Sequence, residues 1–415
     1  MARNYARLTS PWNLQSAVWA LLDLPADPAP EDPNSLLLNA RVLAALPGIR
    51  DARPHKADAA NVLHDYLAIA IPYNVELARL HQGLELGGKL LAWNLAYDLD
   101  AAVAAYERTH DIRLERLIEL GLDAAMSMRD DRVGRFDDIR RRVMPAWGSN
   151  RYSPEKKEWV AWDAFTGAIT HPAIIYANLV QSRSTDPARR TVAARYLADS
   201  ITAINAFDPW WRKDAETQAG WYLDPLYQDV APLNHMNLLG LAHIELCTRY
   251  RSQTSCEKAA GLAEYFKSSL KHATDGTCSW EYWAGAFVPK HRSDSGEDVT
   301  HAHLNVRFAH LAWRNGIVIE KPVIKCMARP LRERVMRQSG DWAMGIDGRG
   351  ELIGSKQHEG LSAWMVLEDV DPTVSAPIEA FMLSRPNNYP LGLLSYATGP
   401  ASFARRLPAT APPGR

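Results

Sequence analysis

Apolar residues recur at helical spacing through most of the chain. They define stretches of roughly 12 to 20 residues separated by short polar or Pro/Gly breaks, whereas the alternation typical of strands is scarce. Pro187 and Pro232 fall near the starts of two stretches, where the missing N–H of proline costs nothing. The pattern predicts a mainly α fold. The clearest helical stretches are 59–71, 111–125, 187–206, 231–249, 255–271 and 298–314.

Several helical stretches open with a polar segment that contains histidine. The leading histidines are separated by 61, 64, 66 and 57 residues, and a period of about 60 is the length of one long helical hairpin. The whole chain would then hold about six or seven hairpins arranged as an α/α toroid, with the polar helix ends around one mouth. Thirteen histidines in 415 positions can also produce such a series by chance. The histidines are His110, His171, His235, His301 and His358.

The C-terminal part departs from this pattern. In 340–356 the letters DGRG indicate a tight turn between short extended pieces, which predicts a small β-hairpin or a lid. Residues 401–415 are basic and rich in proline, so we expect a disordered tail. We therefore expect one catalytic toroid domain over 1–400.

Charge and hydropathy narrow the function classes. Forty-seven basic and 48 acidic residues give a net charge of -1, which disfavours a dedicated nucleic-acid binder. No stretch approaches the roughly 18 apolar residues of a membrane span. No secretion signal is evident, because Asp23 and Pro25 interrupt the first apolar stretch. The location stays open between the cytoplasm and, if a signal has been removed, the periplasm or the exterior.

The four cysteines include no CxxC pair, which argues against a structural zinc site. Cys247 and Cys256 flank a polar turn, where they would either bridge a helical hairpin or remain free thiols. His301 and His303 are metal-ligand types, but two positions apart on a helix they point to different faces. We expect no metal and no cofactor.

Titratable and aromatic residues are densest in 278–307. Such a loop leading into a helix is typical of a functional site, although a solvated loop before a capped helix is the plain alternative. A second cluster is the pair Asn234 and His235 at a predicted helix start, which alone is more typical of a cap and a surface residue. The first cluster comprises Trp280, Glu281, Tyr282, Trp283, His291, Arg292, Glu297, Asp298, His301, His303, Asn305 and Arg307, and a third, weaker one comprises Asp163, Thr166, His171, Tyr176 and Asn178.

Five features together resemble polysaccharide lyases with α/α-toroid folds that act on uronic-acid polymers such as alginate or glucuronan. They are the helical hairpin repeat, a TG…HPA segment, an Asn-His pair, a W-x-Y-W stretch and an EDVTHAHLNV helix. The chain is also similar to the helical domain of glucuronyl C5-epimerases. The resemblance covers 60–330, and LNHMNL stands where one alginate lyase group has NNHSYW.

The resemblance implies metal-independent β-elimination from an acidic, 4-linked polysaccharide or oligosaccharide. A carboxylate must be neutralised, a C5 proton removed and the departing O4 protonated. Asn234 would bind the carboxylate, helped by Arg292 or Arg307. His235 would be the base or the partner of the base, and Tyr282 the acid or both acid and base. His301 and His303 are alternates for these roles, and the substrate-binding candidates are His171, Tyr176, Trp280, Glu297, Arg307 and His358.

Three other functions remain open. An inverting glycoside hydrolase needs two carboxylates about 6.5–9.5 Å apart. A uronate C5-epimerase would share the proton abstraction but leave the chain length unchanged. A non-catalytic glycan-binding scaffold would leave the 278–307 residues dispersed over the surface. The hydrolase candidates are Asp163, Glu281, Glu297, Asp298 and Glu359.

Overall fold

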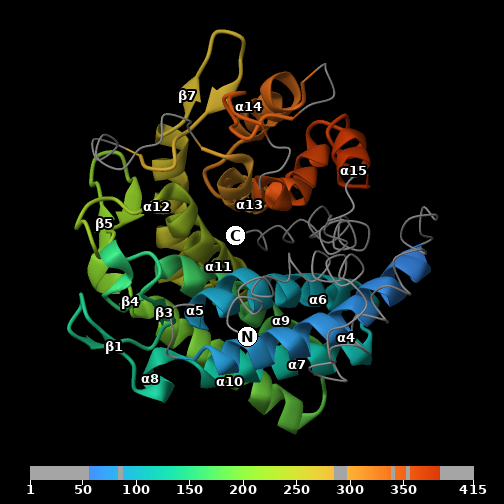
Figure 1. The fold of residues 1–415 in the computed structure, drawn as a ribbon, viewed down its shortest axis with the longest axis vertical. Coiled ribbons are helices and arrows are strands. Elements are labelled where there is room, and N and C mark those ends of the chain that lie inside the picture. Colours follow the sequence, from blue (N-terminus) through green and yellow to red (C-terminus); the bar gives the residue numbers. More distant parts are fainter. Residues whose placement is uncertain (1–55, 83–86, 285–296, 338–341, 352–355, 384–415) are drawn as a thin grey trace, which may run out of the picture.

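The computed structural model describes residues 56–82, 87–284, 297–337, 342–351 and 356–383 (Figure 1). They form a mainly α fold with short β-hairpins, which confirms the predicted fold class. All six stretches predicted as helical lie in helices with bounds within three residues at most ends. These helices are α4 (Lys56–Leu80), α7 (Ile112–Ser127), α10 (Pro187–Asn205), α11 (Leu233–Tyr250), α12 (Gln253–Ser268) and α13 (Val299–Arg314).

The remaining helices complete a row of antiparallel hairpins. They are α5 (Gly87–Leu90), the π-helical η2 (Leu91–Leu95), α6 (Ala96–Thr109), α8 (Asp130–Val133), α9 (Asp163–Arg183), α14 (Lys321–Pro330), the π-helical η5 (Leu331–Val335), the 3-10 helix η6 (Lys356–Asp369) and α15 (Ser375–Leu383). The successive hairpins pair α6 with α7, α9 with α10, α11 with α12, α13 with α14 and η6 with α15.

The helices form two layers. Seventeen of the 21 residues of α9 are buried, against five of the 19 residues of α10, and a helix buried on every face lies inside. The inner row runs α6, α9, α11, α13 and η6, each packed on the next. Since Arg307 of α13 also contacts Asp100 of α6, the inner row curves back on itself. The described residues thus form the curved, two-layered arrangement of an α/α toroid (Figure 1).

Four of the five histidines in the predicted repeat lie on successive inner helices. His171, His235 and His301 lie on α9, α11 and α13, and the backbone of His358 lies in η6. His110 breaks the series, because it ends α6 in a left-handed conformation (φ 57°) and precedes the outer helix α7. None of the described helices is long and apolar enough to cross a membrane.

The two kinds of connection differ in length. Inner helices lead to outer ones through short turns, such as 184–186 and 251–252, whereas the return segments 128–162, 206–232 and 269–298 are long. All long segments therefore reach the end where the inner helices begin. They carry four antiparallel hairpins: β1 (Phe136–Asp137) with β2 (Arg142–Val143), β3 (Gly148–Ser149) with β4 (Val160–Ala161), β5 (Trp211–Lys213) with β6 (Gly220–Tyr222), and β7 (Lys271–His272) with β8 (Cys278–Ser279).

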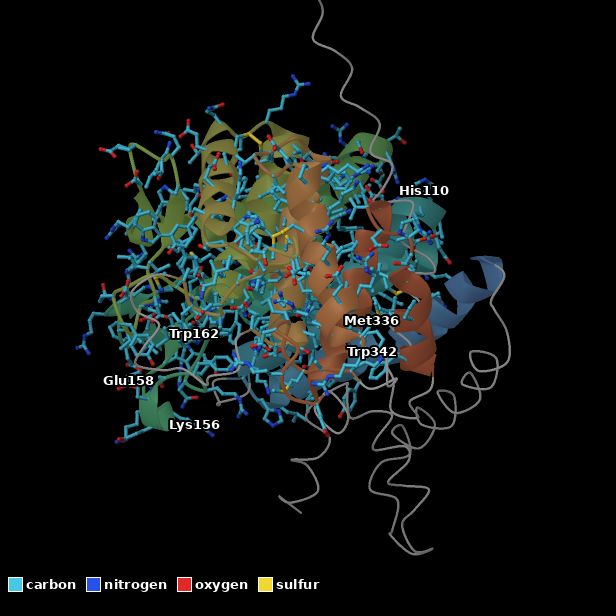
Figure 2. All side chains as sticks on the ribbon, turned by 90° about the horizontal axis from the view of Figure 1, so that it is seen from above. His110, Lys156, Glu158, Trp162, Met336 and Trp342 are labelled. Atoms are coloured by element: carbon cyan, nitrogen blue, oxygen red, sulfur yellow. A yellow bond between two sulfur atoms is a disulfide. The ribbon has the colours of Figure 1, made fainter. Side chains whose placement is uncertain are left out.

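In its described part, segment 340–356 forms the predicted tight turn, in which the Gly345 N–H donates to the Arg349 carbonyl over 2.9 Å. Trp342 bridges to Met336, which lies beside it (Figure 2), and Gly345 bridges to Asp298. Val299 N–H also donates to the Met344 carbonyl over 2.9 Å. These residues lie along the start of α13. The expected tail 401–415 lies outside the described residues.

Candidate functional site

Three inner helices begin at the long-loop end of the toroid. Helix α9 starts at Asp163, α11 at Leu233 and α13 at Val299, with Asp298 as the N-cap of α13. At the start of α13 the Asp298 carboxylate accepts from the Thr300 and His301 N–H groups, whereas α11 has no side-chain cap, so the partial positive charge at the start of α11 favours an anionic ligand. Figure 2 shows Trp162, directly before α9, far from His110 at the short-loop side. Asp163, Asn234, His235, Tyr282, Asp298 and His301 therefore lie at one end of the toroid.

Tyr282 and His235 form the centre of this convergence. The Tyr282 hydroxyl lies 3.3 Å from Nε2 of His235, and their rings meet edge to face. The Leu233 N–H donates to the Tyr282 carbonyl over 3.0 Å, which fixes the loop to the start of α11. The buried Asn234 side chain adjoins this pair and acts to lower the pKa of Tyr282, and its Oδ1 has no partner. Three of the predicted residues are thus in mutual contact.

Asp163 lies on the other side of the His235 ring. Its Oδ1 is 3.8 Å from Nδ1 of His235, beyond hydrogen-bond distance, and Nδ1 has no partner. Burial, together with the carboxylate of Asp224, raises the pKa of Asp163 to about 7. Asp163 therefore exchanges its proton near neutral pH while facing an unpaired imidazole nitrogen.

The two central groups are held in their neutral forms by opposite pKa shifts. Burial and the proximity of His301 lower the pKa of His235 to about 3, so its imidazole is an unprotonated acceptor. Burial and the nearby Glu297 raise the pKa of the Tyr282 hydroxyl above its usual value, so it keeps its proton. A base without a proton and an acid with one stand side by side at neutral pH.

His301 and Asp298 form the solvent-facing side of the site. His301 Nδ1 lies 2.5 Å from Asp298 Oδ2, and its ring meets Tyr282 edge to face with centroids 5.2 Å apart. Burial acts to raise the pKa of Asp298, but His301 and two backbone donors of α13 hold it below its usual value. The His301 side chain is 41% exposed, so solvent reaches the group next to Tyr282.

Glu297 is fully buried beneath these residues. Asn305 Nδ2 donates to its Oε2 over 3.2 Å, and Asn237 donates to Asn305 over 2.7 Å, while Oε1 has no partner. Burial and the adjacent Asp298 raise the pKa of Glu297 well above its usual value. Glu297 thus links α11 to α13 through Asn305 and Asn237 and does not itself face solvent.

An aromatic cluster that the sequence reasoning missed borders His235. The Trp162 ring meets His235 edge to face, and Tyr152 packs edge to face on Trp162 and Phe165. Trp93 Nε1 donates to the Tyr152 hydroxyl over 2.9 Å. Tyr152 remains 42% exposed, as a sugar-stacking ring requires. Its signal in the sequence is the density of aromatic residues in 147–162.

Arg307 and His171 lie in a separate, deeper network. Asp100 of α6 accepts from Arg307 and lies 2.9 Å from Nδ1 of His171, and His171 Nε2 is 3.8 Å from Glu245 of α11. Burial acts to raise the pKa of Asp100, but Arg307 and His171 hold it well below its usual value. The charge of Arg307 is already balanced here, and the network joins four inner helices.

The other predicted residues lie away from the Tyr282–His235 pair or outside the described part. Tyr176 is fully buried and donates to Glu119 of the outer helix α7 over 2.7 Å. Trp280 is buried in a stack with Trp364. His303 contacts the Thr300 carbonyl, and burial lowers its pKa to about 3. Arg292 and the side chain of His358 lie outside the described residues.

Among the described residues, no three metal-ligand atoms gather at this end of the toroid. The one such group comprises His272, Cys278 and Cys326 beside the β7–β8 hairpin. Two disulfides are present, Cys247–Cys256 and Cys278–Cys326.

No protein-family model and no curated protein matches the sequence. Two solved structures are similar in fold, both of inactive variants of an alpha-1,6-mannanase, GH76A of Salegentibacter sp. HEL1_6, bound to alpha-1,6-mannotriose or alpha-1,6-mannotetrose. Their TM-scores are 0.43 and 0.44 at 11% sequence identity, over 75% and 74% of this chain and 90% and 88% of theirs. At this similarity the activity of the mannanase does not carry over, and the chemistry of this chain rests on its own residues.

Proposed function

We propose that this chain is a glycan-cleaving enzyme that acts on an acidic, 4-linked polysaccharide or oligosaccharide by β-elimination. The observation that carries the proposal is the contact between Tyr282 and His235, an acid with its proton beside a base without one. Elimination needs these two functions on neighbouring atoms of one sugar ring. The start of α11 next to them has no side-chain cap and suits a carboxylate on that ring.

The proposed reaction starts with substrate binding. The carboxylate of the uronate lies at the start of α11, where the Asn234 amide hydrogen-bonds it and stabilises the charge that develops on deprotonation. Tyr152 stacks on a neighbouring sugar ring, because it is exposed and its hydroxyl is anchored by Trp93. These contacts orient the C5 proton toward the Tyr282–His235 pair.

Proton transfer follows in two parts. Nε2 of His235 takes the C5 proton, and the electron pair left at C5 is delocalised into the carboxyl group. As the C4=C5 double bond forms, the C4–O4 bond breaks and the Tyr282 hydroxyl donates its proton to O4. Water is not consumed. His235 then returns its proton to the Tyr282 oxygen across their 3.3 Å contact, which restores both groups.

Asp163 supports inverting hydrolysis as a second candidate. Its pKa of about 7 leaves it able to donate a proton near neutral pH, whereas Asp298 is held ionised. Two carboxyl groups with pKa values pushed apart are the acid and base of a glycosidase. In this reaction water enters the product, and Tyr282 has no required role in proton transfer.

Product analysis in heavy-oxygen water separates the two candidates. The chain is incubated with glucuronan, polymannuronate, polyguluronate, hyaluronan, heparosan and polygalacturonate, and products are analysed by mass spectrometry. Elimination gives unsaturated products with no oxygen from solvent, whereas hydrolysis incorporates one solvent oxygen per cleavage. The Tyr282→Phe variant is incubated with the same polymers for comparison. The substitution should abolish elimination but not hydrolysis.

A further inference from the structure

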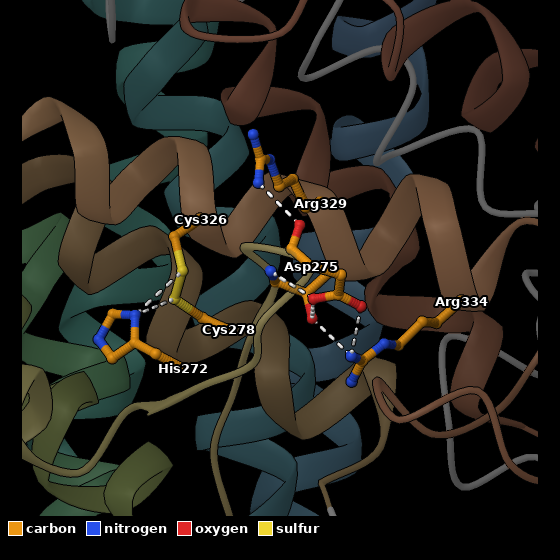
Figure 3. The surroundings of a disulfide bond; sticks show 7 residues. His272, Asp275, Cys278, Cys326, Arg329 and Arg334 are labelled. Carbon is orange, nitrogen blue, oxygen red and sulfur yellow. Dashed lines mark hydrogen bonds and ion pairs between the residues drawn. A yellow bond between two sulfur atoms is a disulfide. The ribbon is translucent and has the colours of Figure 1, made fainter.

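Three metal-ligating side chains meet beside the β7–β8 hairpin, away from the Tyr282–His235 pair. His272 and Cys278 are directly opposed in the β7–β8 ladder, so their side chains share one face. Cys326 of α14 reaches the same face and is bonded to Cys278. Nδ1 of His272 lies 3.5 Å from the Cys278 sulfur and 3.6 Å from the Cys326 sulfur (Figure 3). One imidazole nitrogen thus faces both sulfurs nearly equally.

We propose that His272, Cys278 and Cys326 bind a thiophilic divalent cation such as Zn²⁺ when this disulfide is reduced. Tetrahedral zinc, with Zn–S of about 2.3 Å and Zn–N of about 2.0 Å, places N and S ligands about 3.6 Å apart. The imidazole is already at this distance from each sulfur, and all three ligand atoms lie within 4.8 Å of one another. Only the two sulfurs have to separate.

Reduction of the Cys278–Cys326 disulfide requires a reductant, which an external dithiol supplies. The dithiol transfers two electrons and two protons to the disulfide, giving two thiols and its own cyclic disulfide. The cation then displaces the two thiol protons and is bound by two thiolates and the neutral imidazole. His272 is exposed, so a water molecule has access to the fourth position.

The two ligand-bearing segments are held together by more than the disulfide. Arg329 of α14 donates to the Asp275 carbonyl over 3.0 Å, and Arg334 of η5 donates to the Asp275 carboxylate over 3.1 Å (Figure 3). Gly276 has a φ of 78°, and a Cβ on it would lie 1.8 Å from Arg329, so the hairpin turn packs directly on this guanidinium. These contacts keep the hairpin on α14 when the sulfurs separate.

The second disulfide offers an internal control. Cys247 and Cys256 join the ends of α11 and α12, and neither belongs to a group of three metal-ligand atoms among the described residues. A Cys247→Ser/Cys256→Ser double variant therefore removes two thiols without touching the proposed site. His272→Ala and Cys326→Ser each remove one proposed ligand, and both residues lie outside the buried core.

The experiment titrates the full chain with Co²⁺ before and after reduction by a phosphine. One equivalent should bind only after reduction, with a thiolate-to-cobalt charge-transfer band that Zn²⁺ displaces. The band should persist in the Cys247→Ser/Cys256→Ser variant, vanish in Cys326→Ser and weaken at least about tenfold in affinity in His272→Ala.

Three results would overturn the proposal. One is the lack of a charge-transfer band when all four thiols are titratable. Another is a band that survives both Cys326→Ser and His272→Ala, which would put the metal on Cys247 and Cys256. The third is a loss of helical circular dichroism on reduction that added Zn²⁺ does not restore.

Discussion

The Tyr282 hydroxyl lies 3.3 Å from Nε2 of His235, although 47 residues separate the two in sequence. They meet at the start of α11, where the Leu233 N–H donates to the Tyr282 carbonyl. His235 in turn lies between this hydroxyl and Asp163. The predictions below begin with this pair and extend to the groups that support it.

Replacing Tyr282 by Phe removes the proton donor and keeps the ring. We expect kcat to fall by about 10²–10⁴-fold, the usual contribution of a positioned general acid. The rate is followed by the ultraviolet absorbance of the C4=C5 double bond. Tyr265→Phe is the matched control, because Tyr265 lies on the outer helix α12 against Trp221. Equal rates for the two variants would remove Tyr282 from the reaction.

Replacing His235 by Gln keeps a polar side chain but removes the base. We expect a loss of activity of about 10²–10⁴-fold with the helix content unchanged. His110→Gln is the control, since His110 lies at the opposite end of the toroid (Figure 2). A His235→Gln enzyme with normal kcat would show that another group takes the C5 proton.

The raised pKa of Asp163 predicts how stability changes with pH. The folded chain keeps the Asp163 proton up to a pH of about 7, whereas the unfolded chain loses it above about 3.8. The folded state thus binds more protons between these values, and the unfolding free energy falls as pH rises through this window. Asp163→Asn should remove that part of the slope. Urea unfolding of the original chain and of the variant at pH 4.5 and 8 measures this change in unfolding free energy. The prediction would be contradicted if the free energy changed by the same amount between the two pH values in both proteins.

The contact between Arg307 and Asp100 joins α13 to α6 across the inner row. Arg307→Met leaves Asp100 without its main cation, and we expect a loss of about 2–3 kcal/mol in unfolding free energy. The expected loss of unfolding free energy is smaller than for a fully buried ion pair, because the Asp100 side chain is 20% exposed. The double variant Arg307→Met/Asp100→Asn should recover part of the loss. Additive losses in this cycle would mean that the two residues do not interact.

The two disulfides should stabilise the chain unequally. In the chain-entropy relation, the Cys278–Cys326 disulfide, which closes a loop of 48 residues, stabilises the folded chain by about 4 kcal/mol. The Cys247–Cys256 disulfide, which closes a loop of nine residues, stabilises it by about 2.6 kcal/mol. Cys326→Ser should therefore lower the unfolding free energy more than Cys256→Ser does. Denaturant unfolding under oxidising conditions measures both, and the reverse order would show that strain or residual structure outweighs loop length.

The helices were predictable from the sequence because apolar spacing reports directly on a buried helix face. The resemblance to α/α-toroid lyases also grouped Asn234, His235 and Tyr282. Arg307 and Tyr176 show the limit of that reasoning. Residue type does not reveal a partner, and these two side chains contact Asp100 and Glu119.

The sequence does not show which distant segments contact each other. Tyr152 joins Trp93 and Trp162 from a loop of irregular structure, where no periodicity applies. The group of His272, Cys278 and Cys326 spans 54 residues and lacks the short ligand spacing of a zinc motif, so the absence of CxxC argued against the site now proposed. Only the packing of the hairpin on α14 brings these atoms together.

The most direct test of the central claim is the mass of the cleavage products formed from polyuronates in heavy-oxygen water. The account predicts that one of these polymers yields unsaturated products that contain no solvent oxygen, and that Tyr282→Phe abolishes their formation. Saturated products that each carry one solvent oxygen, formed equally well by Tyr282→Phe, would contradict β-elimination and leave Asp163 as the residue to study.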